Sequence, residues 1–103
     1  MSIRIDCDVD GYEKCWVEFR DEHWPFGDRR KAVNCQDDTE ILEIVVGYID
    51  GWSLTDFEGK KLPFDKEKGL ENFDRLEDGT IIGWIMGAWF QARTQKKEVP
   101  KNS

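Results

Sequence analysis

The stretch that decides the predicted fold is residues 52–64, Trp-Ser-Leu-Thr-Asp-Phe-Glu-Gly-Lys-Lys-Leu-Pro-Phe. Residues 56–59 have the composition of a tight turn, because Gly adopts left-handed backbone without strain and an Asp side chain can bond to nearby backbone N–H groups. Pro63 removes a backbone donor and disfavours helix at Leu62, so we expect residues 62–64 to be extended. The stretch therefore predicts a turn between two larger elements.

The segment before this turn has the pattern of an amphipathic helix. Asp37 is a good N-cap, and Glu40 stands three residues later, as in a capping box. We expect the helix to end near Gly51, with Trp52 at or just beyond its end. The apolar residues that recur at helical spacing are Ile41, Ile44, Val45, Tyr48, Ile49 and Trp52.

The segment after the turn, residues 78–97, is predicted to be a second long helix with apolar residues around most of its circumference. Gly83 and Gly87 leave a flat strip on which another backbone can pack closely. We expect a mainly core helix that keeps one edge for a partner. The expected core face is Ile81, Trp84, Ile85, Ala88 and Ala92, and the candidate partner-binding residues are Trp84, Met86, Trp89 and Phe90.

The first twenty residues are predicted to form a β-hairpin, because apolar residues alternate at odd positions on both sides of Gly11. A three-residue loop, 9–11, keeps odd residues opposite odd ones. The resulting pairs are Ile3–Val17, Ile5–Cys15, Asp6–Lys14 and Arg4–Trp16, with the Arg4 side chain over the indole and Cys7 not directly opposite Cys15.

Two shorter helices complete the prediction. The first follows the break at residues 24–27 and has Asp28 as its cap, and the second begins at residue 65 or 66 and runs through Phe73. The predicted fold class is α+β: an N-terminal β-hairpin followed by a small bundle of three to four helices.

The chain has 103 residues, which suit one compact domain, expected at residues 1–97, and a disordered basic tail at 98–103. Three cysteines cannot all pair, which is typical of a reducing cytoplasm. We find no signal peptide and no run long enough to span a membrane, so we predict a soluble intracellular protein that does not bind membranes.

The net charge of −7 is unevenly distributed: acidic residues outnumber basic ones in residues 1–92, and the reverse holds in residues 93–103. An acidic body argues against binding nucleic acid, because neutralising phosphates requires a basic face. The acidic surface can simply keep a small protein soluble. The alternative is a DNA mimic or a partner for a basic protein.

We identify no catalytic residues, no metal ligands and no cofactor site, and we predict that the protein is not an enzyme. His23 is the single histidine, and neighbours such as Glu22 and Trp24 are typical of a surface imidazole. Asp6, Asp8 and Asp10 alternate as in a calcium loop, but the Gly and distal Glu of the EF-hand are missing. A solvated strand face explains them better.

Taken in order, these elements resemble the small tail assembly chaperones of long-tailed (siphovirus-type) bacteriophages. The resemblance rests on the hairpin, residues 24–30, the capped helix, residues 54–63 and the final helix. It implies a structural turn in which Trp52 is the anchor, Asp56 the cap and Gly59 the permissive residue, with Pro63 in the same motif.

The resemblance also implies a function without catalysis. Such proteins bind the tape measure protein, keep it soluble and help the tail tube protein polymerise around it. They act in the host bacterial cytoplasm and are absent from the mature virion. Self-association stays open, as do two rival functions: an acidic phage-encoded inhibitor of a host defence protein, and a general interaction module in a bacterial complex.

Overall fold

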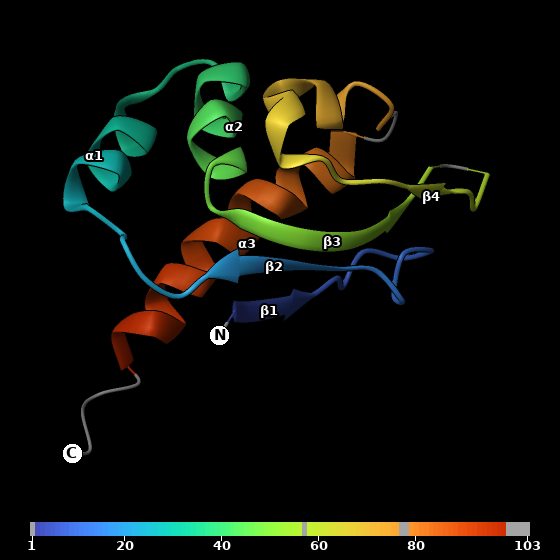
Figure 1. Cartoon of the computed structure of the whole chain (residues 1–103), viewed down its shortest axis with the longest axis horizontal. Coiled ribbons are helices and arrows are strands. Elements are labelled where there is room, and N and C mark those ends of the chain that lie inside the picture. The colour runs from blue at the N-terminus through green and yellow to red at the C-terminus, as the bar shows by residue number, and fades with distance from the viewer. Residues whose placement is uncertain (1, 57, 77–78, 99–103) are drawn as a thin grey trace.

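The chain forms a four-stranded antiparallel sheet, in the order β1-β2-β3-β4, that packs with helices in the computed structural model (Figure 1). The predicted α+β class is confirmed. The structure describes residues 2–56, 58–76 and 79–98, with side chains as far as residue 94. The elements are β1 (Ser2–Asp6), β2 (Trp16–Arg20), α1 (Phe26–Asn34), α2 (Asp38–Val46), β3 (Ile49–Thr55), β4 (Lys61–Leu62), the 3₁₀ helix η1 (Lys66–Phe73) and α3 (Gly79–Glu98).

The N-terminal hairpin is confirmed, but its predicted register is wrong by two residues. Odd residues do pair with odd ones, so Ile5 and Val17 are buried together. The Arg4 guanidinium lies 4.5 Å from the centre of the Trp16 ring, as predicted, although the two residues are diagonal neighbours. The observed pairs are Ser2–Arg20, Ile3–Phe19, Arg4–Glu18, Ile5–Val17 and Asp6–Trp16.

The register differs because the connection between the strands is longer than three residues. Two successive turns form it: Tyr12 N–H donates to Val9 O, and Cys15 N–H donates to Tyr12 O, each at 2.9 Å. Gly11 has the predicted positive φ, +90°. Cys7 N–H donates to Cys15 O at 2.9 Å, so the two cysteines are opposed across the hairpin, contrary to the prediction, and both are free thiols.

The helix before the central turn is shorter than predicted. The Asp37 cap is confirmed, since its Oδ1 accepts from Thr39 N–H at 2.8 Å, but α2 ends at Val46. Residues 49–55 form β3 instead, so Trp52 lies within a strand and the helix does not end near Gly51.

A β-bulge explains why the strand resembled a helix. Glu18 pairs with Gly51 and Phe19 with Ile49, so one residue of β3 is extra at this point. The bulge places the buried residues Ile49 and Trp52 three apart, which is helical spacing rather than the two or four of a regular strand. The apolar residues at 49 and 52 do share a buried face, but their spacing of three indicated a helix where the chain forms a strand.

The predicted turn is confirmed at every described residue, while Phe57 lies outside the described part. Asp56 Oδ1 accepts from Glu58 N–H at 2.8 Å and from Lys60 N–H at 2.9 Å. Gly59 has φ +88° and donates its N–H to Asp56 O. The turn joins β3 to β4, in which Leu62 is extended as predicted.

Trp52 anchors the segment that follows this hairpin. Its Nε1–H donates to Leu62 O at 3.0 Å, and its ring contacts Phe64 and Phe73 at centroid distances of 4.9 and 5.7 Å. Phe73 ends η1, which begins after the cap Asp65 within the predicted range. One buried indole therefore joins β3, β4 and η1.

Among the described residues, the last helix supplies more buried core residues than any other helix. Its buried residues are Ile81, Ile85, Ala88, Trp89 and Ala92, so Trp89 takes the place predicted for Trp84. Gly83 and Gly87 are exposed, and a Cβ at either would meet only open space, so the predicted close packing on them is wrong. The predicted start at Asp78 and the tail at 99–103 lie outside the described residues; Glu98 ends α3.

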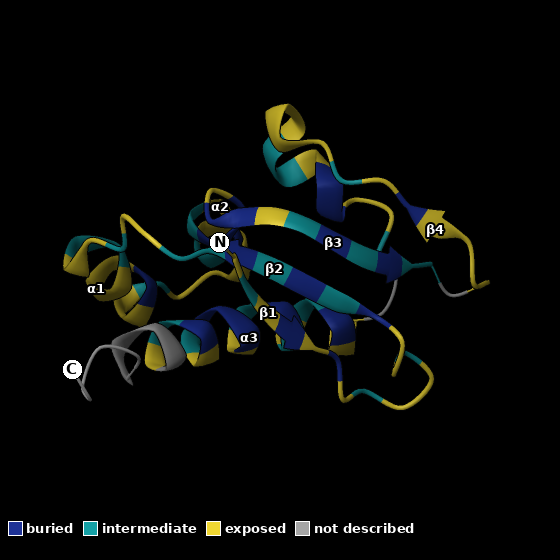
Figure 2. Cartoon of the chain, turned by 60° about the horizontal axis from the view of Figure 1, so that its bottom comes forward, coloured by how far each residue is buried: buried dark blue, intermediate teal, exposed yellow. Residues whose placement is uncertain are grey.

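Helix α3 packs against the sheet, and the remaining helices are joined to it through α2. α3 lies against β1 and β2 and passes behind the sheet in Figure 1, α2 packs on α3 and η1, and α1 packs on α2. Figure 2 shows buried and half-buried residues alternating along β2. The half-buried ones, such as Trp16 and Glu18, face away from the helices. The sheet has two strands, β3 and β4, beyond the predicted hairpin.

The turn at Asp56 can be tested by substitution. Asp56→Ala removes the oxygen that accepts two backbone N–H groups, and we expect the free energy of unfolding to fall by about 1–2 kcal/mol. Asp56→Asn keeps that oxygen and should recover most of the loss. Urea denaturation measures both variants. Equal losses for Ala and Asn would show that these two hydrogen bonds do not stabilise the hairpin.

Candidate protein-binding surface

Helix α1 is linked to an aromatic cluster, which we define as Phe19, Trp24, Tyr48, Trp89 and Phe90. The chain enters α1 from Trp24, whose Nε1–H donates to Arg20 O at 2.7 Å. Pro25 occupies the N-cap position and makes no side-chain cap, so the predicted Asp28 cap is wrong.

Asp28 instead ties α1 to the connection between α2 and β3. Its Oδ2 accepts from the Tyr48 hydroxyl at 2.6 Å, and the Arg20 guanidinium lies 4.1 Å from the centre of the same ring. Burial and the neighbouring Asp28 carboxylate raise the pKa of Tyr48 to about 12. The phenol therefore stays protonated and remains a donor at neutral pH.

The outward side of α1 is the most exposed apolar surface among the described residues. Ala32 is the buried residue of this nine-residue helix. Phe26 is 62% exposed and Val33 is 61% exposed, and these are the exposed large hydrophobic side chains of the described part. They are seven residues apart, which places them on the same side of the helix two turns apart.

Basic residues flank these apolar side chains. Arg29 and Arg30 are exposed and lie beside Phe26 and Val33 at helical spacing, and no resolved contact of the described residues neutralises either guanidinium. We call Phe26, Arg29, Arg30 and Val33 the α1 ridge. It is an apolar and basic surface on a protein of net charge −7.

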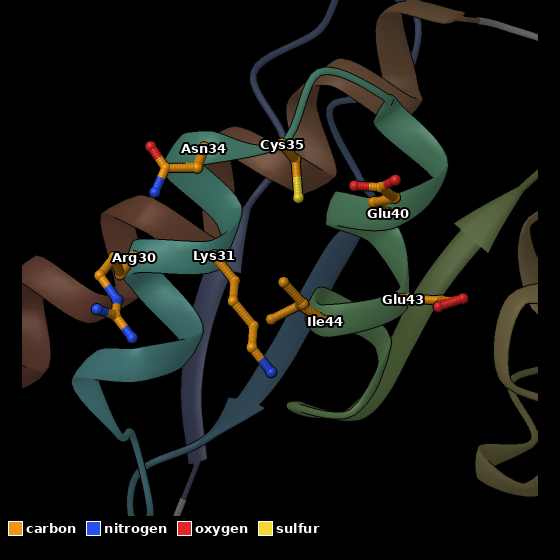
Figure 3. A pocket seen from close by; sticks show the side chains of 7 residues that line it. All are labelled: Arg30, Lys31, Asn34, Cys35, Glu40, Glu43 and Ile44. Atoms are coloured by element: carbon orange, nitrogen blue, oxygen red, sulfur yellow. The ribbon is translucent and has the colours of Figure 1, made fainter.

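A hollow of about 690 Å³ adjoins the ridge, between α1 and α2 (Figure 3). Figure 3 shows the Lys31 side chain extending toward Ile44, while the Arg30 guanidinium points away from it. The α1 wall of the hollow carries the basic residues Arg30 and Lys31, and the α2 wall carries the acidic residues Glu40 and Glu43. The lining residues are Arg30, Lys31, Asn34, Cys35, Glu40, Glu43 and Ile44.

Cys35 lies where the chain passes from α1 to α2. Partial burial, followed by its hydrogen bond to Glu40 and the charge of that carboxylate, raises the pKa of the Cys35 thiol. The protonated thiol is a poor nucleophile and a poor metal ligand at neutral pH. The hollow is therefore lined mainly by charged and polar side chains.

The candidate residues on α3 are divided by the structure. Trp89 is fully buried, so its predicted role in partner binding is wrong: its ring stacks on Trp24 at 5.7 Å. Trp84, Met86 and Phe90 are half-buried and pack against the core. α3 therefore contributes Trp89, the largest fully buried side chain, to the core, and its other large apolar side chains are only partly exposed.

Sequence reasoning missed Phe26 and Val33, although a signal was present. The two residues are seven apart around three consecutive basic residues, 29–31. This spacing places them on the side of a short helix away from Ala32. The spacing shows that Phe26 and Val33 share one face of the helix, but it does not show that this face is exposed to solvent in the folded protein.

Comparisons with protein-family models, curated proteins and solved structures gave no significant match. Within residues 2–56, 58–76 and 79–98, no three His, Cys, Asp or Glu side chains are grouped so as to hold a metal ion. The helices of that same part include none with the length and apolar character required to cross a bilayer.

The link between Tyr48 and Asp28 predicts a pH dependence. In the unfolded chain Tyr48 titrates near pH 10, whereas in the folded protein its pKa is about 12. Above about pH 10 the unfolded state loses a proton that the folded state retains, so stability is full below that pH and is lost as the pH rises through about 12.

We therefore expect Tyr48→Phe to remove this part of the alkaline destabilisation, which is on the order of 1–2 kcal/mol. Urea denaturation of both proteins at several pH values from 8 to 11.5 measures the difference. Tyr12 is present in both and serves as the internal control. Stability curves that stay parallel above pH 10 would contradict a raised pKa at Tyr48.

Proposed function

We propose that this protein is a non-catalytic assembly chaperone of the phage tail type, which binds the tape measure protein through the α1 ridge. The observation that supports this best is the exposure of Phe26 and Val33 on one side of α1. Large apolar side chains on one face give a partner contact area. Their exposure to water is unfavourable in the free protein, so covering them favours binding.

The spacing of the ridge fits a helical partner. Phe26 and Val33 are two helical turns apart, a separation that matches apolar residues at i and i+7 of an amphipathic helix. Arg29 and Arg30 would then favour acidic residues beside that apolar stripe. A tape measure protein, which is long and helical, is a partner of this kind.

The proposed role places the protein in the host bacterial cytoplasm during tail assembly and outside the mature virion. The tail tube protein would be recruited to the tape measure protein held on the ridge. The acidic remainder of the surface supports this role, because net charge keeps a complex with an apolar partner in solution.

The rival function, an acidic inhibitor that mimics DNA, is less well supported. A DNA mimic needs a continuous acidic face, whereas α1, which lies at one end of the molecule in Figure 1, carries the consecutive basic residues Arg29, Arg30 and Lys31. The two functions predict different behaviour. A mimic competes with DNA for a nuclease and is displaced by salt.

Coexpression with a phage tape measure protein tests the proposal. We expect the chain to keep that protein soluble and to copurify with it. The double variant Phe26→Ser/Val33→Ser should bind at least about tenfold more weakly, because it removes the two apolar contacts of the ridge. Its stability should change little, since both side chains are exposed.

Lys61→Ser/Lys68→Ser is the matched control, because these two exposed residues lie outside α1. It should bind as the unmodified chain does. The proposal is wrong if the unmodified chain leaves the tape measure protein insoluble and unbound. Full binding by the ridge variant would show that the partner uses another surface.

A further inference from the structure

The outer edge of β1 is open. β1 is the first strand in the sheet order and pairs with β2 on one side, and no strand of the described residues pairs with its other side. In Figure 1 it forms the lower margin of the sheet. An open edge offers backbone N–H and C=O groups to another strand.

The ladder shows which groups point outward. Cys7 N–H bonds to Cys15 O, and bonded pairs alternate along an antiparallel ladder, so the backbone groups of Ile5 face β2. Arg20 N–H bonds to Tyr48 O on the far side of β2, which agrees with this alternation. The outward groups of β1 therefore belong to the even residues, including Arg4 and Asp6.

We propose that β1 is a self-association edge, where β1 of a second copy pairs antiparallel about a two-fold axis at Ile5. This register places Arg4 opposite Asp6 of the second copy, and Asp6 opposite Arg4 of the second copy. Outward-facing residues then meet outward-facing residues, so each pair can exchange two backbone hydrogen bonds.

Charge selects this register over its neighbours. An axis at Arg4 would place two arginines opposite each other, and an axis at Asp6 would do the same with two aspartates. The side chains of Arg4 and Asp6 are 52% and 76% exposed and lie on one face, since Arg4 Nε is 3.2 Å from Asp6 Oδ1 within one chain. Both can turn to a partner strand.

The helix layer can extend the contact. A pair of five-residue strands is smaller than a stable interface. Because α3 lies against β1, the pairing brings the α3 helices of both copies near each other. Trp84 and Met86 are half-buried apolar residues of α3 that flank its buried stripe. The pairing does not rest on the proposed chaperone function.

Charge reversal at the two positions tests the pairing by sedimentation velocity, from about 10 to about 500 µM chain. We expect the unmodified chain to dimerise as its concentration rises. Arg4→Glu and Asp6→Lys should each weaken the dimer about tenfold or more, because each places like charges opposite each other.

An equimolar mixture of the two variants is the decisive sample. In a mixed dimer Glu at position 4 faces Lys at position 6, and Asp6 faces Arg4, so the mixture should regain the dimer that neither variant forms alone. Glu67→Lys and Lys68→Glu, an exposed pair on η1, are the controls and should leave the dimer unchanged. Circular dichroism checks that every variant folds.

Two results would overturn the inference. One is an unmodified chain that stays monomeric over the whole concentration range. The other is a dimer that both reversals leave unchanged, or whose loss the mixture does not restore. Either would assign the open edge of β1 no role in association.

Discussion

The fold depends on the burial of Trp89 among side chains from distant parts of the chain. Trp24, from the connection between β2 and α1, stacks on it at 5.7 Å, and Tyr48, from the connection between α2 and β3, meets it edge-on at 5.4 Å. These contacts hold α1, the sheet and α3 together. They must also offset a cost, because Trp89 Nε1 is buried and has no acceptor among the described residues.

The position of Trp89 determines which surfaces stay free. Because α3 turns this ring and the residues at its helical spacing inward, the helix keeps only half-buried apolar side chains at its flanks. α1 has the opposite arrangement: Ala32 is its buried residue, and Asp28 fixes it through Tyr48. Phe26 and Val33 are therefore left exposed on a helix that has one buried residue.

The hairpin has a comparable division between its two edges. β2 is enclosed by β1 and β3, whereas no strand of the described residues pairs with the far edge of β1. Exposed edges favour association unless something opposes it, and charged side chains are the usual means. Arg4 and Asp6 exclude registers that oppose like charges, yet the same two residues are complementary when the strand meets a copy of itself at Ile5. The same two charges can thus disfavour pairing in other registers and favour pairing with a second copy at Ile5.

Local sequence determined the elements whose signals lie within a few residues of one another. The cap at Asp37, the turn at Asp56 and Gly59, the start of η1 near residue 65 and the odd-numbered apolar face of the hairpin were all predictable, because each depends on nearby hydrogen bonds or on a period of two. Only the tertiary structure decided the identity of residues 49–55, the hairpin register and the burial of Trp89. The bulge opposite Glu18 gave a strand the apolar spacing of a helix. The burial of Trp89 depends on the rings of Tyr48 and Trp24, which are 41 and 65 residues away along the chain, and no local pattern specifies such contacts.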